Sequence, residues 1–143
     1  MATLPEDGDT LLAVPPGTTS DPLELVHMIE EGLPLAALDN LAKAIAPDDS
    51  HFKFRIVPKA TLERKRKQRR RLTSAEGDRV ARLWKVFSFA SSIYKDEAKV
   101  LEFLTRPHVM LEGKTPRDVA LSTGPGADFV INLLGRAAYG GGV

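Results

Sequence analysis

A short run of cationic side chains is the part of this sequence with the most evident chemistry. Residues 51–71 hold ten Lys or Arg residues and a single acid, Glu63, so the segment carries a formal charge of +9. Guanidinium and ammonium groups bind phosphate oxygens, and Arg can do so through two parallel hydrogen bonds. Such a density of cations predicts a polyanionic partner, most often a nucleic acid. The alternative is an ordinary solvated helix face, or cover by acidic residues elsewhere in the chain.

The charges of the chain are segregated along the sequence. The net charge of the 143 residues is only +1, yet residues 1–50 carry −9 and residues 72–143 carry +1. The acidic first third begins with residues 1–20, which have little periodicity and include the sequence Pro-Pro-Gly, so we expect a mostly extended N-terminal arm there. Whether this arm covers the basic segment is left open by the sequence.

Helices are predicted to carry the basic run. Pro58 suits the first position of a helix over residues 58–68, and Leu62 is its main inward apolar residue. The preceding segment, residues 51–57 (HFKFRIV), alternates like a strand. Its place between helices nevertheless favours a short helix.

Two further amphipathic helices are predicted upstream, one capped by Asp21 and ending before Gly32, the other between Pro34 and Pro47. A supporting helix, a turn and a basic helix are the parts of a helix-turn-helix. About 4 to 6 phosphate contacts would give a log–log salt dependence near −4 to −5. The candidate DNA-binding residues are Lys59, Thr61, Arg64, Lys65, Lys67, Arg69 and Arg70.

A long apolar helix is predicted from Thr73 to Tyr94. Thr73 and Glu76 match a capping box, in which each side chain satisfies the backbone N–H of the other residue. The helix then has two neighbouring apolar stripes, which require packing partners on two sides, and we expect Trp84 in the core. The stripes are Val80, Leu83, Trp84, Phe87, Ser91 and Tyr94, and beside them Val86, Phe89, Ala90 and Ile93.

The rest of the chain is also predicted to be helical. Asp96 can cap one helix, Thr115 can cap a short second one, and Gly124-Pro125-Gly126 is expected to break the latter. A last helix is expected to fray from Tyr139 onwards. The predicted class is therefore all-α, with an arm at 1–20, a helix-turn-helix-like DNA-binding and dimerisation region at 21–71, and a C-terminal domain with a tail at 72–143.

Catalytic and metal-binding patterns are missing from the sequence. There is no Cys, and His27, His51 and His108 are isolated from one another and from any HExxH-like pair. No phosphate loop or GxSxG motif is present. We therefore predict a protein that is not an enzyme and needs no cofactor or metal. The chain also lacks a secretory signal pattern or a membrane-length apolar run, which predicts a cytoplasmic protein without a membrane partner.

Three C-terminal motifs carry a resemblance. They are Leu72-Thr73 with Glu76 at the start of the long helix, LEGKTP at residues 111–116, and LLGR at residues 133–136 before a Tyr-Gly pair. Together they resemble the Xre/MbcA/ParS-type antitoxins that are paired with RES-domain toxins. Upstream, EGLPLAALDNLAKAI and VPKATLERKRK resemble the Xre-type helix-turn-helix of that family. The chain departs from many relatives at residues 55–58, where Arg-Ile-Val-Pro replaces a turn containing glycine.

The resemblance implies an antitoxin that neutralises an NAD-degrading RES-domain toxin and represses its own operator DNA. In that family the C-terminal end of the antitoxin obstructs the toxin's active-site cleft. A homodimer within a larger toxin–antitoxin complex is expected, and a stand-alone helix-turn-helix transcriptional regulator is the alternative. An unstructured tail remains the alternative for the chain end. The residues that would take the toxin-binding role are Gly135, Arg136, Tyr139, Gly140, Gly141, Gly142 and Val143.

Overall fold

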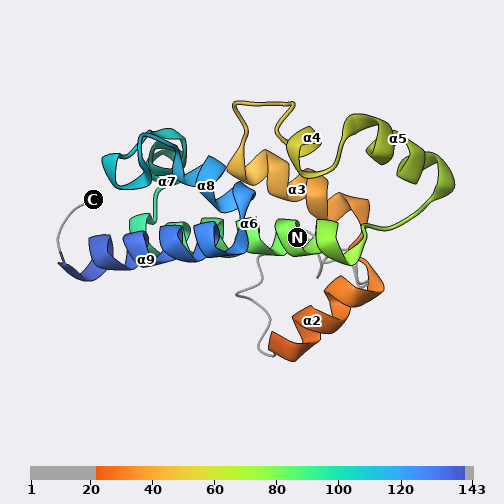
Figure 1. Ribbon diagram of the computed structural model, residues 1–143, viewed down its shortest axis with the longest axis horizontal. Coiled ribbons are helices and arrows are strands. Elements are labelled where there is room, and N and C mark those ends of the chain that lie inside the picture. Colours follow the sequence, from red (N-terminus) through yellow and green to blue (C-terminus); the bar gives the residue numbers. More distant parts are fainter. Residues whose placement is uncertain (1–21, 141–143) are drawn as a thin grey trace, which may run out of the picture. The chain divides into compact units, whose positions relative to one another are not determined.

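The computed structural model describes residues 22–140, which form helices joined by short connections (Figure 1). Over these residues the only strand-like feature is an isolated antiparallel bridge between His108 and Lys114. The predicted all-α class is confirmed. The expectations for the N-terminal arm, for Asp21 as a cap and for residues 141–143 fall outside the described residues. The chain divides into two compact units, the first ending at Ala81 and the second beginning at Arg82.

The first unit contains α2 (Pro22–Glu31), α3 (Leu35–Ile45), α4 (Lys53–Ile56), α5 (Lys59–Gln68) and the start of α6 (Ser74–Tyr94). The segment HFKFRIV thus forms a short helix, as favoured from its position. Its fully buried Phe52 and Ile56 are four residues apart, a helical spacing. The larger buried side chains of this unit are Leu38, Leu41, Ile45, Phe52, Ile56, Val57, Leu62 and Val80.

The connection after α2 is tied to the connection before α6. The backbone N–H of Leu72 donates to the carbonyl of Leu33 at 2.9 Å, and Arg71 Nη1 donates to the carbonyl of Gly32 at 3.3 Å. Gly32 has φ +104°, and a Cβ added there would lie 3.0 Å from both Arg71 Cβ and the carbonyl oxygen of Leu72. Only glycine fits this crossing without strain.

The long helix α6 begins as predicted. The Thr73 N–H donates to Glu76 Oε1 at 2.8 Å, and the Glu76 N–H donates to Thr73 Oγ1 at 3.2 Å, so the capping box is complete. Trp84 is 6% exposed, which confirms its place in the core. The far end is less covered than the predicted stripes suggest, because Phe87, Phe89, Ser91, Ile93 and Tyr94 are only half-buried.

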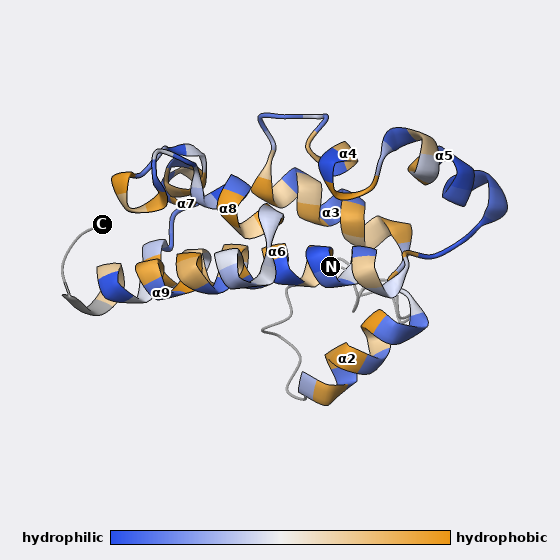
Figure 2. Ribbon diagram, viewed as in Figure 1, coloured by the Kyte–Doolittle hydropathy of each residue, from blue (hydrophilic) through white to orange (hydrophobic). Residues whose placement is uncertain are grey.

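The second unit contains the rest of α6, α7 (Glu97–Thr105), the 3-10 turn η2 (Val109–Leu111), α8 (Pro116–Ser122) and α9 (Gly124–Gly140). Figure 2 shows hydrophobic and hydrophilic residues alternating along α9, as expected for an amphipathic helix. Its buried residues are Ala127, Val130, Leu133 and Leu134.

Local capping signals mark the helix starts in this unit. Asp96 accepts from the Ala98 N–H at 2.9 Å and Thr115 accepts from the Asp118 N–H at 3.1 Å, so both predicted caps are confirmed. The third start differs from the prediction. Thr123 separates α8 from α9. Its Oγ1 caps α9 by accepting from the Gly126 N–H at 2.9 Å.

Two predictions about α9 therefore need correction. The Gly-Pro-Gly sequence at residues 124–126 forms the first turn of α9, because a proline beside the helix start loses no intrahelical hydrogen bond. At the other end, Tyr139 and Gly140 are still helical, so α9 ends later than predicted.

The crossing at Gly32 gives a test of the fold. We expect Gly32→Ala to lower the free energy of unfolding by roughly 1–3 kcal/mol, because the added Cβ would meet two close neighbours in a left-handed backbone conformation. Chemical denaturation measures the change. The control is Gly124→Ala, where an added Cβ meets open space and the backbone needs no glycine. A change at Gly32 no larger than at Gly124 would contradict the assignment.

Candidate functional site

The basic helix α5 buries one edge and exposes the other. Leu62 is 2% exposed, which confirms it as the inward anchor. Arg64 and Lys67 are exposed, three residues apart on the opposite side of the helix. Figure 2 shows this helix as the most continuously hydrophilic ribbon of the first unit. Of the other candidate DNA-binding residues, Lys59, Arg69 and Arg70 are exposed and Thr61 is half-buried.

Lys65 has a different role from its neighbours. It is 7% exposed, and its Nζ lies 3.3 Å from Glu76 Oε1 and donates to the Arg71 carbonyl at 3.1 Å. Its ammonium group is thus occupied within the protein, and we remove it from the candidate DNA-binding residues. The signal was present in the sequence, because Lys65 is three residues after the anchor Leu62 and so lies on the same helix face.

A second ion-pair cluster orients the basic helix against α3 and α4. Arg66 Nη2 donates to both carboxylate oxygens of Asp39 at 3.2 Å, and Lys53 Nζ lies 3.5 Å from Asp39 Oδ1. No local pattern predicts this cluster, since Asp39 lies 27 residues before Arg66. The side chains of the cluster are 27–48% exposed, so the ion pairs contribute only modestly to stability. Their main effect is to fix the position of α5 against α3 and α4.

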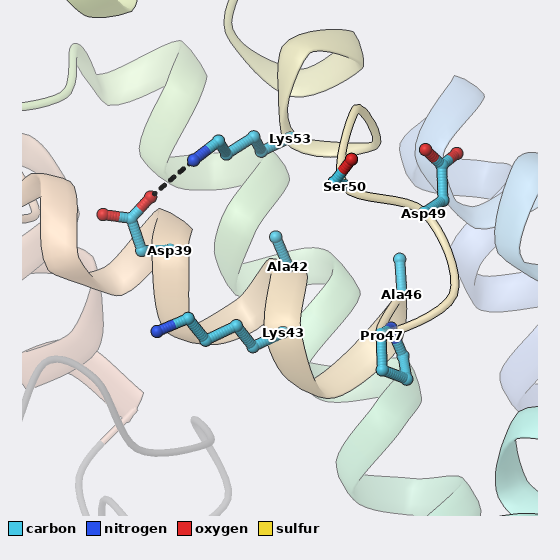
Figure 3. Close-up of a pocket in the computed structure, with 8 residues that line it drawn as sticks. All are labelled: Asp39, Ala42, Lys43, Ala46, Pro47, Asp49, Ser50 and Lys53. Carbon is cyan, nitrogen blue, oxygen red and sulfur yellow. Dashed lines mark ion pairs between the residues drawn. The ribbon is translucent and has the colours of Figure 1, made fainter.

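The same carboxylate borders an open cavity of about 490 Å³ between α3 and the loop that follows it (Figure 3). Figure 3 shows Lys53 reaching to Asp39, with Lys43 on the same helix as Asp39. Two acids and two lysines line the cavity, so its formal charges balance. It therefore offers little net attraction for a phosphate, in contrast to the outer face of α5.

The turn between α4 and α5 does not require glycine. Val57 has φ −132° and ψ 120°, and Pro58 has φ −53° and ψ 146°, both ordinary conformations for these residues. The Phe54 ring lies beside the turn, and its centroid is 5.5 Å from Lys53 Nζ and 5.9 Å from Lys59 Nζ. The Arg-Ile-Val-Pro sequence thus makes a regular short connection into the basic helix.

The candidate residues at the other end of the chain belong to α9. Arg136 is exposed and Gly135 is half-buried, and an added Cβ at Gly135 would meet nothing within 4 Å. Tyr139 and Gly140 are helical in backbone. The candidates Gly141, Gly142 and Val143 fall outside the described residues.

Other polar groups of the second unit serve its folding. Arg82 donates to the carbonyls of Ala120 at 3.0 Å and Leu121 at 2.9 Å, near the C-terminal end of α8, where a cation is electrostatically favourable. Burial raises the pKa of Tyr94, with a further increase from the Glu102 carboxylate. This phenol therefore stays neutral at physiological pH.

Two kinds of site are not found in the described part of the chain. Residues 22–140 contain no group of three or more His, Cys, Asp or Glu side chains that could hold a metal ion. None of the helices formed by these residues combines the length and apolar character needed to span a bilayer.

The contrast between Lys65 and Lys67 can be tested. We expect Lys65→Met to lower the free energy of unfolding by about 1–3 kcal/mol, because the largely buried Glu76 carboxylate loses its cation. The matched substitution Lys67→Met, on the exposed face, should change it by less than about 0.5 kcal/mol. Urea denaturation of both variants provides the measurement. Equal effects would show that the Lys65–Glu76 contact is not structural.

Comparison with known proteins finds two successive domain matches. Residues 24–84 match the antitoxin Xre-like helix-turn-helix domain, and residues 90–140 match the antitoxin Xre/MbcA/ParS C-terminal toxin-binding domain. The chain is also similar to antitoxin Xre of Yersinia enterocolitica (serotype O:8 / biotype 1B), with 29% identity over 118 residues, 81% of this chain and 79% of that protein. The two domain matches and this relative together show that the chain is similar to Xre-type antitoxins over most of its length.

Proposed function

We propose that this protein neutralises an NAD-degrading RES-domain toxin and represses transcription from its own operator, without catalysing a reaction itself. The observation that carries the proposal is the pairing of two matches, one to a helix-turn-helix and one to a toxin-binding domain. The RES class of the toxin rests on the resemblance of the LEGKTP and LLGR motifs to antitoxins of such systems. On this proposal the protein acts in the cytoplasm.

The DNA-binding half of the proposal rests on the exposed side of α5. Arg64 and Lys67 extend from it, and Lys59 begins it. In a helix-turn-helix the N-terminal part of the second helix contacts base edges in the major groove, while surrounding cations bind phosphates. On this proposal Thr61 contacts base edges, and Arg69 and Arg70 bind phosphates. A homodimer would present two such helices to the two halves of an operator.

The toxin-binding half rests on the end of α9. A glycine inside a helix is less stable than alanine by about 0.8–1.0 kcal/mol. Packing within the fold does not require glycine at position 135, because a Cβ added there would meet no atom within 4 Å. Such a gap suits close approach by a partner's backbone. Arg136 adds a planar group that can pair with a carboxylate or occupy an anion site.

A stand-alone transcriptional regulator is the competing function. It would retain the basic helix and use the second unit only for dimerisation. The match of residues 90–140 to a toxin-binding domain favours the antitoxin instead.

Operator binding is tested by reversing charge on α5. We expect the double variant Arg64→Glu, Lys67→Glu to lose operator affinity more than tenfold, and the wild-type log–log salt dependence of about −4 to −5 to become shallower by about 2. Fluorescence anisotropy with DNA from the chain's own promoter measures both. Lys85→Glu with Lys99→Glu, both exposed in the second unit, is the charge-matched control. Equal losses in both double variants would contradict the assignment to α5.

Toxin neutralisation is tested by shortening the chain. A protein ending at Arg136 should still fold, because the last buried residue described, Leu134, is retained. We expect it to let the co-expressed toxin consume NAD, measured in the cell extract, while the full chain prevents this. Full protection by the shortened chain would exclude obstruction by the tail.

Gly135→Ala examines the same mechanism at full length. Alanine should stabilise the free protein by up to about 1 kcal/mol. It should also weaken NAD protection if the toxin's backbone lies against Gly135.

A further inference from the structure

The second unit carries a cluster of exposed apolar side chains. Val109 is 94% exposed, Met110 51% and Phe129 41%. Within the described residues of this unit, no other large hydrophobic side chain is exposed to this degree. Val109 and Met110 belong to η2 and Phe129 to α9, and Met110 and Phe129 border the same cavity although they are distant in sequence.

Met110 and Phe129 border an open cavity of about 480 Å³. Leu111, Val119, Pro125 and Gly126 complete most of its lining, and Glu112 and Lys114 contribute one charge of each sign. A pocket that is mainly apolar with a charge-balanced edge suits an aliphatic or aromatic side chain. We call it the η2–α9 pocket.

The backbone around the η2–α9 pocket is held in place. The left-handed residues Glu112 and Gly113 (φ 57° and 83°) reverse the chain, and His108 accepts from the Gly113 N–H at 2.9 Å and donates to the Lys114 carbonyl at 3.1 Å. On the other side, a Cβ added at Gly126 would lie 2.3 Å from the Val119 carbonyl, so α8 and α9 pack in close contact. A pre-formed pocket lowers the entropy lost when a partner binds.

The pocket is continuous with the proposed toxin-binding end of α9. Phe129, Asn132 and Arg136 are all exposed, and their spacing of three and seven residues places them on one helix face. Phe129 and Arg136 are about 10 Å apart along the axis, at 1.5 Å per residue. One partner can therefore contact the pocket and the helix end together.

We propose that the η2–α9 pocket receives an aliphatic or aromatic side chain of the toxin and forms a second anchor, separate from the tail. The inference rests on the proposed function for the identity of the partner. It is supported by the position of every lining residue within the toxin-binding match, residues 90–140. A second copy of the chain is the alternative occupant, and the measurement below distinguishes it from the toxin.

The anchor has a distinct kinetic role. On the proposed function, the tail obstructs the toxin's active site. The pocket instead slows dissociation of the whole antitoxin, because changes at an interface act mainly on the dissociation rate. Full-length Met110→Asp should therefore dissociate from the RES-domain toxin at least tenfold faster than wild type. Met110→Leu should retain slow dissociation. Val26→Asp, at a residue of similar exposure (46%) in the first unit, is the control.

The measurement is surface plasmon resonance with purified full-length chains and immobilised toxin, alongside thermal melting and operator binding. Met110→Gln provides a neutral second variant if the aspartate lowers the melting temperature. If both polar variants dissociate as slowly as wild type, the inference is overturned and the proposed function stands. Slow dissociation with a loss of self-association would also overturn it, by assigning the pocket to a second copy. A wild-type chain that does not bind the toxin would overturn the proposed function and this inference together.

Discussion

The buried contact between Lys65 and Glu76 is the interaction on which the candidate DNA surface depends. Isolated in a protein interior, either charge would be strongly destabilising. Here Lys65 also donates to the Arg71 carbonyl, and Glu76 also accepts from the Thr73 N–H. The same carboxylate therefore caps α6 and holds α5. A pair held by these further hydrogen bonds contributes more to fixing one arrangement than to net stability.

The position of Lys65 determines what its neighbours do. Successive residues of a helix are turned by about 100°, so an inward Lys65 places Arg64 and Lys67 toward solvent. Arg66 lies to the side, where Asp39 binds it. The charge of +9 over residues 51–71 is consequently not one uniform surface. Part of it is used within the fold, and the exposed remainder forms a narrower cationic patch.

Local signals in the sequence predicted most of the fold but only part of the site. The Thr73–Glu76 capping box, the caps at Asp96 and Thr115, and the glycine after α2 depend on residues close in sequence, and the structure confirms them. The inward Lys65 was missed because composition outweighed its helical spacing from Leu62. The η2–α9 pocket could not be predicted, because apolar residues are ordinarily assigned to the core and its exposure arises from a tight turn between distant elements.

The packing of α9 explains how one helix can serve both fold and partner. Among the residues of α9 whose burial is described, the last buried one is Leu134, and none of residues 135–138 is buried. The core therefore stabilises the first part of the helix, while the last turns depend mainly on weak local propensity, lowered further by Gly135. A partner that contacts these turns competes with few intramolecular contacts. The exposed Arg136 on these turns can thus adjust to a partner, while Phe129, on the well-packed part, keeps a fixed position beside its pocket.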